Sequence, residues 1–428
     1  MIWNRNVWSG IKIKRWICIG ILGLFFIIFG SADIIHNNDS YIHNVAISIL
    51  FILLGSVIVY YAIKQIINSY INFISGETCN FSTNSKKINS YTQEKRILLK
   101  GPKIVVIGGG TGLSTMLRGL KKHTANLTAI VTVGDDGGGS GDLREDLGIL
   151  PPGDIRNCIL ALAETEPLMK ELLQYRFKEG RLENQSFGNL FLAAMDGISG
   201  SFEEAVRKMG DVLAVTGKVL PVTLEDMVLK ATLKNGNIIT GESIIPKQVI
   251  QQKSPIHELK IIPENAKALN EALLAIGEAD AVIIGPGSLY TSIIPNLLVK
   301  EITEKLISSK AMKIYVSNVM TQPGETDEYL LEDHLEAIYK HSSKKIIDYV
   351  IVNNSTISKG IKEKYLQKQS IPVYYRENIE QSYNLKLVYG DIISISPDYV
   401  RHEPIKLANI IMNLIKKENC ICKRLYRK

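Results

Sequence analysis

Two long apolar stretches without a charged residue lie near the start of the chain, at residues 16–32 and 45–63. Their lengths of 17 and 19 residues fall in the range of roughly 17 to 25 that crosses a bilayer as a helix. A cleaved signal peptide and a buried core helix are the alternatives. Ser31-Ala32-Asp33 is a poor cleavage site, and the second stretch follows after a dozen residues. The pattern therefore predicts two transmembrane helices within residues 1–67.

A polar stretch follows at 68–102, which predicts a flexible linker. From residue 103 the apolar runs become short and end in glycine or small polar residues, as at 104–107, 127–133, 281–284 and 314–316. Such runs are typical of buried parallel strands. We predict a Rossmann-like α/β domain over 103–415, with a mostly parallel sheet and helices on both faces. Residues 219–245 alternate apolar and polar positions, which predicts a β-rich excursion.

The first of these strands runs into a glycine turn that precedes a helix-like pattern. A turn without Cβ atoms lets backbone N–H groups approach a phosphate at the positive end of the helix dipole. Leu113 stands where the third glycine of a dinucleotide fingerprint would be, so a tight connection remains the alternative. The predicted phosphate-binding residues are Gly108, Gly109, Gly110, Thr111 and Gly112.

Acidic residues follow the second strand. Asp135 lies 25 residues beyond Gly110, close to the offset at which an acidic residue takes a ribose hydroxyl. Asp135 and Asp136 could instead hold Mg²⁺ or form a simple Asp-Gly turn, and the sequence leaves these three readings open.

Two arginines, Arg144 and Arg156, offer forked donors for phosphate oxygens, with surface ion pairing as the alternative. Asp154 is predicted to be the N-cap of a helix that begins at residue 155. Asn189, in the first turn of another predicted helix, is either an amide donor to a ligand or a cap.

Two further strand ends carry small and polar residues, which are Gly285, Gly287 and Ser288 after one strand and Asn318 after the next. Ligands of open parallel sheets bind beyond the carboxyl ends of the strands. Four such ends therefore predict a site for a phosphorylated small molecule.

The formal charge of +7 is concentrated at the two ends of the chain. Residues 1–15 carry +4 and the tail at 416–428 carries +5, so the remainder is slightly acidic. We expect these ends to meet anionic lipid headgroups, and we expect no nucleic-acid partner. Basic residues flank both apolar stretches and none lies between them, so the positive-inside rule places the N-terminus and the main domain in the cytoplasm.

The five cysteines lack zinc-ligand spacing and are expected to be free thiols.

Six motifs in one order resemble the YvcK-type gluconeogenesis factors of the CofD-like superfamily, whose other members include 2-phospho-L-lactate transferase. They are GGGTGLS at 108–114, DDGGGSGDLR at 135–144, PPGDIRN at 151–157, SFGNL at 186–190, GPGSLYTS at 285–292 and NVMTQPGETD at 318–327. The resemblance spans about residues 102–414. It implies binding of a nucleotide sugar such as UDP-N-acetylglucosamine and a role in carbon metabolism, cell-wall synthesis and cell shape. The transferase relatives instead join a phospholactyl group to a deazaflavin.

The resemblance also suggests two further ligand contacts: a ring at Tyr365 to stack on a base and a guanidinium at Arg401 for the diphosphate. The sequence departs from the family at two positions. Gly139 stands where a second Ser is usual, and Gln185 replaces a common His. The loss of that His removes one candidate acid or base, which disfavours catalysis.

We therefore expect a multi-pass cell-membrane protein whose cytosolic domain binds a UDP-sugar. We expect this domain to regulate envelope synthesis through protein partners of that machinery. A homo-oligomer is compatible with the sequence. No cofactor is expected to be required and no catalytic residue is assigned, because no Ser or Cys has an evident His partner. The alternative is a transferase of the 2-phospho-L-lactate type that uses Mg²⁺ held by Asp135 and Asp136.

Overall fold

The computed structural model describes residues 13–36, 42–74, 97–164, 167–396 and 399–425. The chain divides into two compact units, Met1–Thr92 and Gln93–Lys428.

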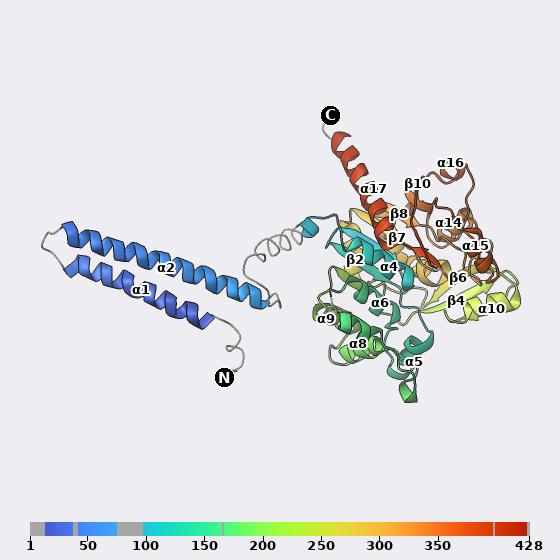
Figure 1. Cartoon of the computed structure of the whole chain (residues 1–428). Coiled ribbons are helices and arrows are strands. Elements are labelled where there is room, and N and C mark those ends of the chain that lie inside the picture. The colour runs from blue at the N-terminus through green and yellow to red at the C-terminus, as the bar shows by residue number, and fades with distance from the viewer. Residues whose placement is uncertain (1–12, 37–41, 75–96, 165–166, 397–398, 426–428) are drawn as a thin grey trace. The chain divides into compact units, whose positions relative to one another are not determined.

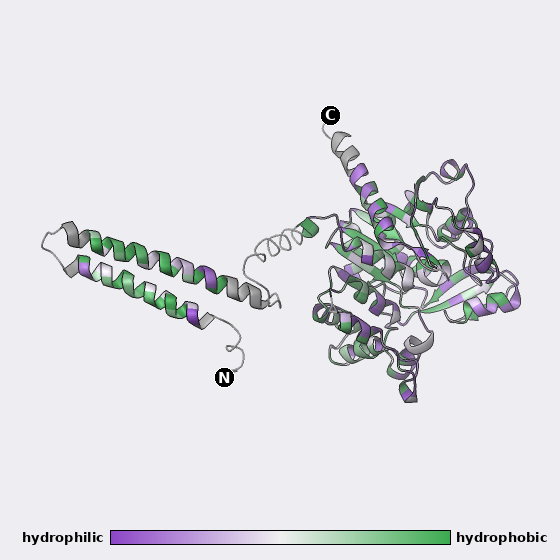
Figure 2. Ribbon diagram, viewed as in Figure 1, coloured by the Kyte–Doolittle hydropathy of each residue, from purple (hydrophilic) through white to green (hydrophobic). Residues whose placement is uncertain are grey.

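The first unit is a pair of long helices, α1 (Ile13–His36) and α2 (Ile42–Ile74), which pack along each other (Figure 1). They contain stretches long and apolar enough to cross a membrane, Arg15–Ile34 and Ala46–Ile67. Only 11% and 17% of these stretches are buried, and Figure 2 shows apolar residues over most of both helices. The two predicted apolar helices are therefore confirmed, and their insertion in a membrane stays a prediction.

The second unit is built on a seven-stranded sheet in which every neighbouring pair is parallel. The strand order is β10-β9-β8-β7-β1-β2-β3. The strands are β1 (Ile104–Gly108), β2 (Leu127–Val131), β3 (Lys218–Pro221), β7 (Ala281–Ile284), β8 (Met312–Val316), β9 (Tyr349–Asn353) and β10 (Lys386–Gly390).

The central strands are covered on both faces. Every residue of β1 and β7 is buried, and successive side chains of a strand point to opposite faces. The helices that cover and connect the strands are α4 (Gly110–Leu120), α5 (Gly138–Leu147), α6 (Gly153–Leu162), α7 (Pro167–Gln174), α8 (Phe187–Gly197), α9 (Phe202–Val212), α10 (Ile245–Gln252), α11 (Asn270–Glu278), α12 (Ile294–Leu298), α13 (Lys300–Ser308), α14 (Leu331–Lys340), α15 (Lys359–Leu366) and α16 (Ile379–Tyr383), with short turns η1 (Gly180–Leu182), η2 (Leu289–Ile293) and η3 (Lys344–Ile346). The predicted Rossmann-like α/β fold is confirmed.

Two smaller sheets complete the unit. The predicted β-rich excursion supplies β4 (Val228–Leu233) and β5 (Ile238–Thr240), which join β6 (Ile256–Ile262) in an antiparallel sheet. Near the C-terminus, β11 (Ile393–Ile395) pairs with β12 (Val400–His402), and β12 leads into the final helix α17 (Pro404–Leu425). This helix packs on α4 and then extends away from the other elements of its unit (Figure 1).

The sheet order positions the site. From β1 the chain builds outward through β2 to β3, and it then returns to the other side of β1 with β7. The order therefore reverses between β1 and β7, which is where ligands bind in open α/β sheets.

Candidate functional site at the carboxyl edge of the sheet

The glycine turn joins β1 to α4 at this reversal. Gly110 has φ of +66°, a left-handed conformation that residues with a Cβ rarely adopt. Gly112 lies against the loop after β7, where a Cβ would come within 2.5 Å of the Pro286 carbonyl oxygen. The first backbone N–H groups of α4 have no partner inside the helix, so this end of α4 suits an anion.

A cavity of about 220 Å³ opens beside the start of α4. It lies between the N-terminal end of α4, the loops after β7 and β8, and strand β12. We call this cavity the phosphate pocket. Its lining residues are Thr111, Gly112, Thr115, Pro286, Gly287, Ser288, Asn318, Val319, Met320, Gln322, Val400, Arg401 and His402.

Six of the predicted site residues lie on this pocket: Thr111, Gly112, Gly287, Ser288, Asn318 and Arg401. Four predicted glycines, Gly108, Gly109, Gly110 and Gly285, shape the loops beside it without lining it. Convergence of the strand ends after β1, β7 and β8 therefore agrees with the sequence pattern.

Strand β12 carries Arg401 and His402 to the pocket. The Arg401 guanidinium lies 4.6 Å from the ring centre of Tyr399. Tyr365 does not line the pocket, and its hydroxyl accepts a hydrogen bond from the Val400 N–H at 2.7 Å. The structure thus gives Tyr365 a contact with the strand that carries Arg401.

The aspartates after β2 have backbone partners. Asp135 accepts from the Gly137 N–H at 3.0 Å, as in a local turn. Asp136 accepts from the N–H groups of Glu242 at 2.9 Å and Ser243 at 2.8 Å. Asp136 therefore ties the loop after β5 to the glycine-rich segment and brings Glu242 to this edge of the sheet.

Asp154 corrects an expectation. Helix α6 begins at Gly153 and its N-cap is Pro152, so Asp154 lies in the first turn instead of capping it. Its carboxylate lies against the glycine turn, since a Cβ at Gly109 would come within 2.6 Å of the Asp154 Oδ2 atom. Burial and the charge of Asp135 raise the pKa of Asp154 to about 6, against the opposing effects of the Gly110 N–H and Arg156.

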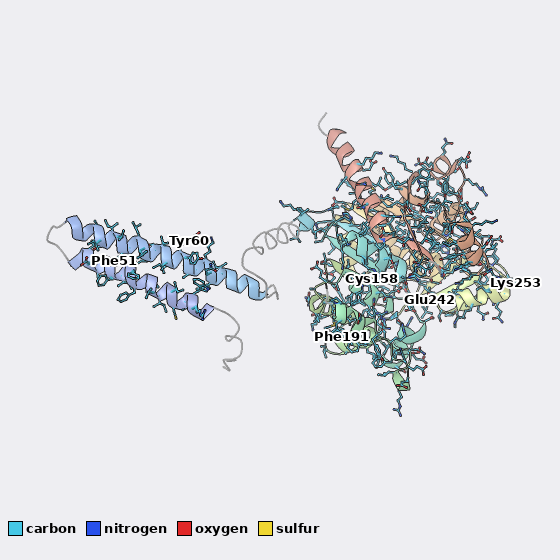
Figure 3. All side chains as sticks on the ribbon, in the orientation of Figure 1. Phe51, Tyr60, Cys158, Phe191, Glu242 and Lys253 are labelled. Atoms are coloured by element: carbon cyan, nitrogen blue, oxygen red, sulfur yellow. The ribbon has the colours of Figure 1, made fainter. Side chains whose placement is uncertain are left out.

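Two glutamates join these acids. Burial, followed by the charges of Asp135, Glu325 and Asp136, raises the pKa of Glu242 to about 8. Burial raises the pKa of Glu325 to about 7, although it accepts from the Tyr290 N–H at 3.0 Å and the Thr291 hydroxyl at 3.1 Å. We call Asp135, Asp154, Glu242 and Glu325 the carboxylate cluster; Figure 3 labels Glu242 within its unit.

The carboxylate cluster favours binding of protons, because buried acids repel one another when ionised. Within the described ranges, no group of three or more His, Cys, Asp or Glu side chains has the arrangement of a metal site. The sequence pattern did not reveal Glu242 or Glu325, because neither residue directly follows a strand of the parallel sheet.

Arg156 and Asn189 lie together in a second buried polar group. The Arg156 guanidinium donates to the Ser186 hydroxyl at 2.9 Å and to Asn157 at 3.0 Å. Ser186 caps α8 by accepting from the Asn189 N–H at 3.1 Å. Three buried atoms of this group have no hydrogen-bond partner among the described residues: Arg156 Nε, Asn189 Oδ1 and Gln185 Oε1.

The two departures from the family pattern touch each other. Gln185 donates to Asp142 at 2.9 Å, and a Cβ at Gly139 would lie 2.6 Å from its Oε1 atom. A side chain at 139 would therefore require the end of the Gln185 side chain to shift.

Arg144 lies apart from the phosphate pocket. It donates to the Met227 carbonyl at 3.0 Å and pairs with Asp226 at 2.5 Å, in the segment between β3 and β4. These contacts agree with the ion-pair alternative for Arg144.

Comparison with known proteins places this geometry in a family. The family model of 2-phospho-L-lactate transferase CofD matches residues 104–393. A gluconeogenesis factor homologue of Clostridium acetobutylicum is 58% identical over 407 residues, which are 95% of this chain and 90% of the relative. The chain belongs to the CofD family and, within it, to the YvcK-type gluconeogenesis factors.

Members of this family differ in length. The gluconeogenesis factor of Bacillus subtilis is 46% identical, and the match covers 74% of this chain but 99% of that relative. A Bacillus halodurans crystal structure, 44% identical with a TM-score of 0.70, likewise covers 73% of this chain and 99% of its own. The Clostridium match is too long for the 93–428 unit alone and must include most of residues 1–92. The helical pair is thus shared by some relatives, while the sheet unit occurs by itself in others.

Proposed function

We propose that this protein is a membrane-tethered regulator whose cytosolic domain binds a UDP-sugar such as UDP-N-acetylglucosamine and controls carbon metabolism, cell-wall synthesis and cell shape. Its relatives carry the name of a gluconeogenesis factor, which supports a regulatory role. UDP-N-acetylglucosamine is the example that the resemblance of the motifs suggests, and the phosphate pocket supports a phosphorylated ligand.

The observation that carries the proposal is the composition of the phosphate pocket. A helix N-terminus, the hydroxyls of Thr111 and Ser288, and the guanidinium of Arg401 meet at one cavity beside the strand reversal. All of these groups donate hydrogen bonds. The Arg401 guanidinium also carries a positive charge, and the helix N-terminus is the positive end of the helix dipole. A diphosphate offers the matching acceptors, and the rest of the nucleotide sugar extends beyond this small cavity.

A second candidate is a Mg²⁺-dependent transferase of the 2-phospho-L-lactate type. The carboxylate cluster favours it, because acids with raised pKa values beside a phosphate site can hold a cation or act as general acids. The matched family model bears the name of that transferase. The two candidates differ in whether the bound ligand is changed.

Direct titration tests the binding proposal. Calorimetry with the full-length protein should show binding of UDP-N-acetylglucosamine, weaker binding of UDP alone, and no comparable binding of GDP-mannose. Equal affinity for the GDP-sugar, or no response to any UDP-sugar, would contradict the proposal.

The membrane part of the proposal rests on the helical pair. Its outward apolar residues need a cover, and bilayer lipid supplies one. The basic residues that flank the spans favour a cytoplasmic domain. Protease added to intact cells without an outer membrane barrier should leave residues 93–428 whole and should degrade them after lysis. Cleavage in intact cells would show the opposite orientation.

A further inference from the structure

Strand β12 brings an imidazole to the phosphate pocket next to Arg401. The Nε2 atom of His402 lies 3.1 Å from the Ser317 carbonyl oxygen, at the end of β8. A carbonyl oxygen can only accept a hydrogen bond, so Nε2 must carry the hydrogen. In the neutral ring, Nδ1 is then a lone-pair acceptor.

The surroundings of the ring favour its neutral form. Burial lowers the pKa of His402 to about 4, against the opposing effect of the Ser317 carbonyl. His402 therefore offers the pocket an acceptor and no second positive charge.

The free nitrogen is accessible. Nδ1 has no hydrogen-bond partner among the described residues, and it is absent from their fully buried unpaired atoms. Asn318 offers no such acceptor, since its amide donates to the Gly287 carbonyl at 2.9 Å and its Oδ1 is fully buried. His402 is thus an acceptor beside a set of donors.

Phosphate oxygens cannot satisfy this acceptor, because an ionised diphosphate has no hydrogen to donate. A matching group must be a neutral N–H or O–H, such as the imide of a pyrimidine base or a hydroxyl or amide of a sugar. A polar atom built to bond one ligand group disfavours analogues that lack it, because the atom is then left unpaired.

We propose that His402 determines ligand specificity by accepting, through Nδ1, a hydrogen bond from a neutral N–H or O–H group of the bound nucleotide sugar. This assignment rests on the proposed UDP-sugar function. It gives the pocket donors for the diphosphate and, at His402, an acceptor for the base or the sugar.

The same residue also has a structural contact, and the two nitrogens separate the two roles. Nε2 anchors β12 to the end of β8. Nδ1 is left to accept a hydrogen bond from the ligand. At position 402, the side-chain amide of glutamine reaches the place of the imidazole Nε2 atom. The shorter side-chain amide of asparagine reaches the place of the Nδ1 atom. His402→Gln therefore keeps the anchor and loses the acceptor, whereas His402→Asn keeps a polar atom for the ligand and loses the anchor.

The experiment titrates UDP-N-acetylglucosamine into the full-length wild type and both variants, with melting temperatures recorded for each. We expect His402→Gln to melt like the wild type and to bind about tenfold more weakly, the loss of one hydrogen bond. We expect His402→Asn to melt at a lower temperature and to retain more affinity than His402→Gln. A parallel titration with UDP locates the donor: the loss in His402→Gln persists with UDP if the uridine donates, and it disappears if the sugar beyond the diphosphate does.

The reverse order of affinities, or equal affinities in both variants, would overturn the assignment and leave His402 as an anchor only. Failure of the wild type to bind any UDP-sugar would overturn the proposed function together with the assignment. The two failures are therefore distinguishable.

Discussion

The phosphate pocket and the carboxylate cluster lie at the same edge of one sheet, yet their chemistry is opposite. The pocket gathers donors, from the start of α4 to Arg401 on β12. The cluster gathers acids, and burial holds the pKa of three of them well above the usual range. The glycine turn connects the two, since a Cβ at Gly109 would come within 2.6 Å of the Asp154 carboxylate. A binding protein needs only the first region, whereas phosphoryl chemistry would also use the second with a metal ion.

The largest expected effect is at the glycine turn. Gly110→Val should weaken UDP-N-acetylglucosamine binding by about 100-fold or more, because a side chain there displaces the backbone donors of a charge-assisted contact. Gly148→Val is the matched control: Gly148 has the same φ of +66°, and a Cβ there meets nothing within 4 Å. Calorimetry should show that the control binds normally. Equal losses in the two variants would mean that backbone strain, and not the phosphate turn, causes the effect.

Arg401→Ala should lower affinity by about 10- to 100-fold, the range of one charge-assisted hydrogen bond. The control Arg144→Ala removes an arginine whose partners are Met227 and Asp226, and it should leave affinity within about threefold. If Arg144→Ala lost as much affinity as Arg401→Ala, the site would have to extend to the segment between β3 and β4.

Tyr365→Phe separates two roles of one ring. The hydroxyl accepts from the Val400 N–H, so its loss should loosen β12 and weaken binding by about threefold to tenfold. Tyr365→Leu, which also removes the ring, should weaken binding no further. A Phe variant that binds like the wild type beside a Leu variant that does not would restore the predicted stacking of this ring on the base.

The last expected effect is a pH dependence of stability. A buried acid with a raised pKa stabilises the fold below its unfolded pKa, and this stability is lost as the pH rises through the folded value. With values of about 6, 7 and 8 for Asp154, Glu325 and Glu242, the urea midpoint should fall between pH 5.5 and pH 8.5. Glu242→Gln should reduce this fall, and an unchanged slope would remove Glu242 from the cluster.

Much of the fold and part of the site could be predicted from the sequence. Short apolar runs that end in glycine or small polar residues identified β1, β2, β7 and β8, because a buried parallel strand needs apolar residues on both faces. The glycine turn and the loops after β7 and β8 followed from the same pattern.

The rest depends on contacts between distant segments. Asp136 brings Glu242 to the site across more than 100 residues, and no local pattern records that hydrogen bond. Asp154 was expected to cap α6, but Pro152 already has helical angles, so the helix begins two residues earlier, at Gly153, and the Asp154 carboxylate is not the cap. Tyr365 and His402 act through β12, whose place beside β8 could be read only from the structure.

The central claim is that the domain binds its nucleotide sugar through the phosphate pocket, without a metal ion and without changing the ligand. The most direct measurement titrates UDP-N-acetylglucosamine into the full-length protein with Mg²⁺ and then with a chelator, followed by mass analysis of the ligand after long incubation with acceptors. We expect equal affinity in both conditions and intact ligand. Strict dependence on Mg²⁺ that disappears in Asp135→Asn, or any turnover of the nucleotide sugar, would contradict the claim and favour the transferase.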